Sequence, residues 1–289
     1  MEIEKIRRFI EICRPYNTLS GVLLFSLGVN FETRRPFDAD ILVGILIIVL
    51  GFTFATIQND IEDKDIDECN SPEKALPSGA ITSGEATAFI KVIGLMLACL
   101  SLYHAPRHVV PVLAAFMLTW AYNKSPFLFS RRPIGSIVLL SILYGVLPLL
   151  YSNILIHSWR VTTGFLLFII LYFLIRISVS ILKDFKDEAG DKIFNKDTFY
   201  LIFGHRVTVW VSIICFSIGA AGILYLIEHG RVPTILLALP AILFFNMWCL
   251  RAKLLATNNP ATLNAYFQKI FIGQNQVDLS LLLCLLLSR

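Results

Sequence analysis

Long apolar segments recur along the whole chain, and they constrain its fold more than any other feature. About 20 apolar residues in a helix cross the hydrocarbon core of a bilayer. Nine segments fit that pattern, at residues 15–31, 41–58, 84–103, 108–122, 134–153, 161–182, 206–227, 232–250 and 277–288. The last is short, and we expect it to begin earlier, near Tyr266, or to lie partly in the interface. The sequence therefore predicts an all-α integral membrane protein, a bundle of nine transmembrane helices.

Composition supports a membrane protein. Of the 289 residues, 56% are hydrophobic and only 16% are charged, whereas soluble domains carry about 25% charged residues. The formal net charge of +4 is too small to suggest nucleic acid, and it fits basic loops beside a bilayer. We expect a single domain over residues 1–289, in contact with membrane lipid and with no nucleic-acid partner.

The basic residues are distributed unevenly between the two sides of the predicted bundle. When successive connections are assigned to alternate sides of the membrane, 17 Lys and Arg residues fall on the side of the N-terminus and six on the other. Cytoplasmic loops carry the excess of Lys and Arg in membrane proteins. We therefore expect a cytoplasmic N-terminus and, with nine spans, a C-terminus on the opposite side.

Acidic residues concentrate in two connections on that same cytoplasmic side. Residues 59–74 hold seven and residues 183–191 hold four, which together make 11 of the 21 acids. Each cluster directly follows a long apolar segment. A pair of solvated acidic loops is the simplest interpretation, but the spacing of the acids argues against it.

The same spacing of aspartates occurs in both clusters. Offsets of 0, +3 and +7 separate Asp60, Asp63 and Asp67, and the same offsets separate Asp184, Asp187 and Asp191. On an α-helix these positions share one face. We therefore expect each segment to present a stripe of three carboxylates, with the two halves of the bundle facing each other across a central cavity.

Aligned carboxylates require cations. They repel one another and raise each other's pKa, and ligand sets made only of oxygen suit Mg²⁺ or Ca²⁺. Because Mg²⁺ often keeps coordination sites for substrate phosphate, two such stripes could hold a diphosphate. The apolar bundle could then hold a hydrocarbon tail, and a prenyl diphosphate has both parts.

Both clusters resemble the motifs of the UbiA family of intramembrane prenyltransferases. The family's NDxxDxxxD motif is matched by residues 59–67, NDIEDKDID, and its KDxxDxxGD type of motif by residues 183–191, KDFKDEAGD. Its LPSG and early RP motifs are similar to residues 76–79 and to Arg14-Pro15. The resemblance covers nearly the whole chain.

The resemblance implies a mechanism and a set of catalytic residues. Mg²⁺ ions bridge the diphosphate and the carboxylates, the allylic C–O bond ionises, and an acceptor in the membrane captures the carbocation. Quinone precursors, other aromatic compounds and lipid glycerol ethers serve as acceptors in the family. The implied catalytic residues are Asn59 with Asp60, Asp63, Asp67, Asp184, Asp187 and Asp191, the six aspartates being the metal ligands.

Several positions differ from the family pattern, mainly near the acceptor side. Ser71 and Lys74 replace two arginines, although Lys74 can still contact a phosphate as a point charge. We consider five residues as candidates for substrate binding, namely Lys74, Tyr122, Arg131, Arg132 and Lys183. For Arg131, Arg132 and Lys183, anchoring at the membrane surface is the alternative.

Two rival functions remain open at the level of sequence. A terpene cyclase of the UbiA type would keep the acidic site and use no acceptor. A transporter would carry charge at the bilayer midplane and inverted repeats, whereas here the acids gather on one side. Arg176 lies within an apolar segment, and it is expected either to reach the acidic site or to snorkel to the interface.

Overall fold

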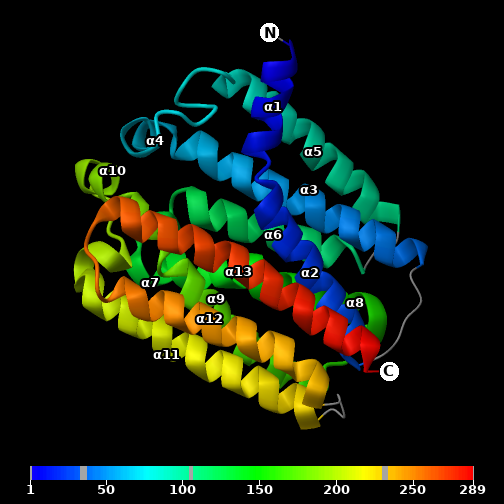
Figure 1. Cartoon of the computed structure of the whole chain (residues 1–289). Coiled ribbons are helices and arrows are strands. Elements are labelled where there is room, and N and C mark those ends of the chain that lie inside the picture. Colours follow the sequence, from blue (N-terminus) through cyan, green and yellow to red (C-terminus); the bar gives the residue numbers. More distant parts are fainter. Residues whose placement is uncertain (1, 33–37, 104–106, 230–233, 289) are drawn as a thin grey trace.

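The structure, a computed structural model, describes residues 2–32, 38–103, 107–229 and 234–288. Within these ranges every regular element is helical (Figure 1). The elements are α1 (Glu2–Ile12), α2 (Pro15–Glu32), α3 (Ala39–Glu62), α4 (Lys64–Asn70), α5 (Ser83–Tyr103), α6 (Val109–Asn123), η1 (Phe129–Arg131), α7 (Pro133–Ser141), η2 (Ile142–Val146), α8 (Leu147–His157), α9 (Thr163–Ser180), η3 (Lys183–Lys186), α10 (Glu188–Ile193), α11 (Phe199–His229), η4 (Thr234–Leu237), α12 (Ala238–Leu254) and α13 (Pro260–Leu287).

The described residues of each of the nine predicted segments are largely helical, while residues 232 and 233 of the eighth segment lie outside the described residues. Not all of these helices satisfy the requirements for a membrane span. Seven described helical segments are long and apolar enough to cross a bilayer. By contrast, α6 has only 15 residues, and α2 begins with the polar run Tyr16-Asn17-Thr18. The chain is thus a multi-pass, all-helical membrane protein, while the count of nine spans and the cytoplasmic N-terminus stay predictions.

The last predicted segment was too short. Instead of covering residues 277–288, α13 begins at Pro260 and has 28 residues. Asn259 caps it, because its Oδ1 accepts from the backbone N–H groups of Ala261 and Thr262, and Pro260 suits the first helical position. Gln274 and Asn275, near its middle, obscured the apolar pattern but are buried inside the bundle.

The bundle has two apolar cores, and α2 contributes to both. One core joins α2, α8, α9, α11, α12 and α13, with Phe168 and Phe216 fully buried. The other joins α2, α3, α5, α6 and α8 around Phe25 and Ile57. Figure 1 shows α3 and α5 on one side of α2 and α11 to α13 on the other. The two predicted halves are therefore present, one for each acidic motif.

A π-helical turn interrupts the helix between Pro133 and His157. The turn is η2, and Pro148 follows it in the first turn of α8. Proline has no N–H to donate to the preceding turn, and such gaps bend or widen a helix. Gly145 lies within η2, where a Cβ would approach the Cγ of Arg176 to 2.4 Å. The widened turn therefore lets α9 pack closely, and it presents Tyr144 to the core formed with α3, α5 and α6.

Arg176 does not snorkel to the surface, and no ion pair joins it to the acidic motifs among the contacts of the described residues. Its side chain is buried, and its Nη1 donates to the Oγ of Ser20 at 3.1 Å. It also interacts electrostatically with Asp278 of α13. Both alternatives from the sequence were therefore wrong, because the partners of Arg176 lie deeper in the bundle.

Asp278 belongs to a buried polar cluster that the sequence did not reveal. Its Oδ1 accepts from the hydroxyl of Tyr172 and from the Nε2 of Gln274, the latter at 3.0 Å. Its Oδ2 has no hydrogen-bond partner within the described residues. An unsatisfied buried polar atom costs about 1–3 kcal/mol, so the remaining donors to Asp278 contribute strongly to the packing of α9 on α13.

Replacing Tyr172 with Phe should therefore destabilise the protein by about 1–3 kcal/mol, because it removes a donor to a buried carboxylate. Thermal unfolding in detergent would measure the loss as a lower Tm. The matched control is Tyr225→Phe, since Tyr225 is exposed on α11 and should leave Tm unchanged. Equal Tm values for both variants would contradict the role given to the Tyr172 hydroxyl.

Candidate active site

The first acidic motif does not lie on one continuous helix. Asp60 is in the last turn of α3, and that helix ends at Glu62. Asp63 stands between helices, with φ −92° and ψ 9°, and Asp67 belongs to α4. The expectation of a stripe on one helical face was therefore wrong, because the chain leaves helical geometry at the middle aspartate.

The second motif repeats this local structure. Asp184 lies in the 3₁₀ turn η3, Asp187 stands between helices with φ −104° and ψ 8°, and Asp191 is in α10. In each motif the carbonyl of the middle aspartate accepts from the N–H of the last one, at 2.8 Å for Asp67 and 3.0 Å for Asp191. The shared spacing thus encodes two similar turns, each followed by a short helix.

Direct contacts join the two motifs at one end of the bundle. The N–H of Gly190 donates to the Oδ1 of Asn70 at 2.6 Å, so α10 rests against α4 (Figure 1). A Cβ on Gly190 would approach the Nδ2 of Asn70 to 2.7 Å, and this close approach explains the glycine. These contacts confirm that the two motifs lie together at one end of the bundle, whereas their action as one catalytic site stays a prediction.

Lys196 is an ionic bridge between the motifs. Its Nζ lies 3.4 Å from the Oδ2 of Asp63 and 3.7 Å from the Oδ1 of Asp191. Burial alone would lower the pKa of Lys196, but the negative charge of Asp63 outweighs burial and raises it. In the sequence, Lys196 is one of several basic residues in a loop. Asn195 directly precedes it and has a φ of +50°. Because Asn tolerates this left-handed conformation, it indicates a turn in the sequence, and this turn returns the chain to the site.

Three further cations pair with the aspartates. Arg14 forms an ion pair with Asp60, Lys74 contacts Asp67 at 2.7 Å, and Lys183 contacts Asp184 at 2.8 Å. Of the predicted substrate-binding residues, the structure therefore places Lys74 and Lys183 in the site, together with Tyr122, whose hydroxyl accepts from the Nζ of Lys183 at 3.4 Å.

Arg14 occupies a strained backbone position. Its φ is +45°, a region that costs a non-glycine residue free energy and is concentrated at functional sites. Burial would lower the pKa of Arg14, but the nearby charge of Asp60 raises it. The break between α1 and α2 therefore aims this guanidinium at the first motif.

Asn59 orients a carboxylate of the first motif. Its Nδ2 donates to the Oδ2 of Asp63 at 3.0 Å. Arg131 and Arg132 behave differently, since both are exposed, and the guanidinium of Arg132 lies 5.1 Å from the ring centre of Phe129. Among the contacts of the described residues, no ion pair joins either arginine to the motifs, so substrate binding by them stays a prediction.

The second motif retains carboxylate oxygens that would accept a cation. The Oδ2 of Asp184 and both oxygens of Asp191 are buried without a hydrogen-bond partner in the described part of the chain. Burial, partly offset by Lys196, raises the pKa of Asp191 to about 7. A group of three or more His, Cys, Asp or Glu side chains arranged for a metal is not found among the described residues. The oxygens fit a hard cation chemically.

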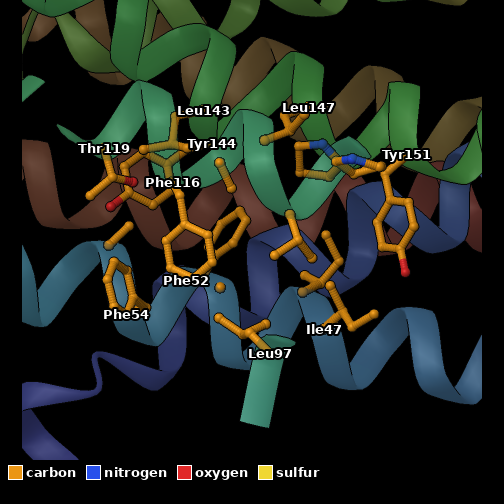
Figure 2. Close-up of a pocket in the computed structure, with 17 residues that line it drawn as sticks. Ile47, Phe52, Phe54, Leu97, Phe116, Thr119, Leu143, Tyr144, Leu147 and Tyr151 are labelled. Atoms are coloured by element: carbon orange, nitrogen blue, oxygen red, sulfur yellow. The ribbon is translucent and has the colours of Figure 1, made fainter. Parts of the chain in front are cut away.

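An apolar pocket lies beneath the first motif, among α3, α5, α6 and the η2–α8 segment. Phe52, Phe116 and Leu97 line it, and Tyr144 projects into it from η2 (Figure 2). Tyr144 also interacts electrostatically with Arg14 and Asp60. The pocket holds only about 40 Å³ and lies within one half of the bundle, rather than between the halves as expected.

Together, these features define a class of protein: a multi-pass helical membrane enzyme with two acidic motifs above an apolar interior. The model of the UbiA prenyltransferase family matches residues 21–273. The chain belongs to this family and is a prenyltransferase that acts in the membrane.

Individual relatives agree. The digeranylgeranylglyceryl phosphate synthase of Thermococcus gammatolerans is 30% identical over 213 residues, 72% of this chain and 73% of that one. A solved structure described as giving insight into digeranylgeranylglyceryl phosphate synthase in membranes has a TM-score of 0.68 and 20% identity, covering 98% and 99% of the two chains. A UbiA homologue from Archaeoglobus fulgidus, bound to GPP and Mg²⁺, has a TM-score of 0.66 and 15% identity, covering 94% and 99%.

Substituting Ala for Gly190 should push α10 away from α4, because the added Cβ would overlap Asn70. Overpacking of this kind costs about 1–3 kcal/mol, and we expect a lower Tm and slower release of diphosphate. Gly84→Ala is the control, since the nearest atom to its Cβ lies at 3.9 Å. If both variants matched the wild type in Tm and in rate, the contact would not couple the motifs.

Proposed function

We propose that this protein transfers a polyprenyl group from a prenyl diphosphate to a lipid acceptor, with Mg²⁺ as cofactor. The observation that carries the proposal is the convergence of both acidic motifs at the end of an apolar bundle, where buried oxygens of Asp184 and Asp191 lack a hydrogen-bond partner within the described residues. The GPP and Mg²⁺ bound to the Archaeoglobus fulgidus homologue support the donor and the cofactor.

The six aspartates would hold the metal, in line with the family motifs. When bound, Mg²⁺ supplies positive charge that stabilises the departing diphosphate. Lys196, Lys183, Arg14 and Lys74 lie beside the same carboxylates. From these positions they would bind oxygens of the diphosphate.

The apolar pocket would receive the start of the prenyl chain. In the transfer, the allylic C–O bond breaks, its electron pair leaves with the diphosphate, and a new bond forms between the allylic carbon and the acceptor oxygen, which loses its proton. Aromatic faces attract cations, and Phe52 and Tyr144 stand 4.9 Å apart, edge to face, in this pocket. Because the pocket is narrow, the lining side chains would rearrange to admit the chain and would keep water out.

For the acceptor, we propose a glycerol lipid that carries a phosphate. The relatives are called digeranylgeranylglyceryl phosphate synthases, a name that specifies a glyceryl phosphate with two geranylgeranyl groups. The corresponding acceptor would carry one such group and a free hydroxyl. The excess of basic residues on the side of the motifs supports an active site that faces the cytoplasm.

Asp63→Asn and Asp187→Asn should each abolish diphosphate release by purified protein supplied with donor and acceptor, because the neutral amide is a poor Mg²⁺ ligand. The matched control is Asp65→Asn, an exposed position on α4 between two motif aspartates, which should keep wild-type rates. EDTA should stop release in the wild type, and added Mg²⁺ should restore it. Full activity in both motif variants, or after chelation, would contradict the metal role.

The acceptor can be tested by omission. Detergent-purified protein with Mg²⁺ and geranylgeranyl diphosphate alone should release little diphosphate, and adding geranylgeranylglyceryl phosphate should start turnover and yield a diether. Mass spectrometry of the lipid products would identify it. Release without acceptor, together with a cyclised hydrocarbon or alcohol, would instead establish a terpene cyclase.

A further inference from the structure

A second polar cavity lies beside the first acidic motif, on the side of α1. It holds about 220 Å³, below the roughly 300–1,000 Å³ of pockets for drug-sized ligands, so it suits a headgroup rather than a whole lipid. Its lining residues are Arg8, Glu11, Ile12, Arg14, Asp60, Asp67, Glu73, Lys74, Ala75, Leu76 and Pro77. The second motif contributes no residue to this lining, so the cavity adjoins the site on the side of the first motif and shares Asp60 and Asp67 with it.

Three cations line the cavity, and they differ in their partners. Arg14 and Lys74 are paired with Asp60 and Asp67 of the motif. Arg8 instead pairs with two glutamates of α1, because its Nη1 donates to the Oε2 of Glu11 at 3.0 Å and its Nε lies 3.4 Å from the Oε1 of Glu4. Its Nη1 also donates to the carbonyl of Glu73 at 3.3 Å. Arg8 is thus the cation of this cavity whose contacts do not involve the metal-binding carboxylates.

The position of α1 connects this cavity with the membrane surface. Ile3, Ile6 and Ile10 form one face of α1 and are 84%, 59% and 57% exposed. The ring of Phe9 on a neighbouring face packs edge to face on Phe89 of α5, at 5.4 Å. An amphipathic helix with an exposed apolar face and adjacent basic residues lies in the bilayer interface, which would place the cavity at headgroup depth.

We propose that this cavity binds the phosphate of the glycerol-lipid acceptor, with Arg8 as the residue that recognises it. Guanidinium groups form strong charged hydrogen bonds with phosphate oxygens. Glu4, Glu11 and the Glu73 carbonyl hold this one in place through its Nε and Nη1, so its Nη2 would donate to the phosphate. With the phosphate at Arg8, the glycerol hydroxyl would extend towards Asp60 and Asp67, where the donor is activated. The inference rests on the proposed function and assigns the acceptor and the donor to different cations.

The neighbouring arginine provides a matched control. Arg7 also pairs with Glu11, at 3.2 Å, but it is exposed and does not line the cavity. The variants are therefore Arg8→Ala, Arg8→Lys and Arg7→Ala, each checked for an unchanged Tm. Initial rates would be measured for two acceptors, geranylgeranylglyceryl phosphate and the same ether without its phosphate, and for geranylgeranyl diphosphate as donor.

We expect Arg8→Ala to raise KM for the phosphorylated acceptor about 10- to 100-fold, as for loss of a hydrogen bond between charged groups. Its KM for the donor, and its rates with the phosphate-free acceptor, should stay within about twofold of wild type. Arg8→Lys should recover part of the loss, and Arg7→Ala should behave as wild type.

Three kinetic results would contradict the inference, and they can be told apart. A higher KM for the donor would assign the cavity to the diphosphate and overturn the inference. Equal losses with both acceptors would show that Arg8 only supports the structure, which also overturns it. If the wild type prenylated neither acceptor, the proposed acceptor class itself would fail, and the role of Arg8 with it.

Discussion

Six aspartates gathered at one end of an apolar bundle create a repulsion that the rest of the active site is arranged to offset. Lys196 is central to this arrangement, since it is buried and contacts one aspartate from each motif. Removing the charge of Lys196 would leave buried carboxylates without a compensating positive charge, which is strongly destabilising. The fold around the site, including the turn at Asn195 and the strained backbone of Arg14, therefore serves to deliver positive charge.

Under the proposed function, the same end of the helix bundle would bind two anionic substrates, the diphosphate donor and the phosphorylated acceptor. The meeting of the motifs, at Lys196 and Lys183, lies on the side of α10, whereas the cavity of Arg8 lies on the side of α1. The apolar pocket with Tyr144 lies below the first motif. Under the proposed function, these three environments would take the metal-bound diphosphate, the headgroup and the hydrocarbon chain.

Much of this organisation could be predicted from the sequence, because hydropathy and spacing are local signals. The helical segments and the two motifs were found in this way, and Lys74, Lys183 and Tyr122 do lie in the site. The helix breaks at Asp63 and Asp187 were missed, since the offsets 0, +3 and +7 also fit an unbroken helix. Lys196 and Arg8 looked like ordinary loop or interfacial cations, and only tertiary packing shows their contacts.

Polar residues within the bundle also bear on how the chain is built during synthesis. Arg251 of α12 is fully buried, and it donates to the Oγ atoms of Ser178 and Ser212, on α9 and α11. Asp278 of α13 likewise depends on Tyr172 of α9. In both cases the charged residue follows its partners in the sequence. Because a chain is synthesised from its N-terminus, each charged side chain enters the bilayer after its hydrogen-bond partners. It therefore does not have to stay unpaired in lipid while the chain is completed.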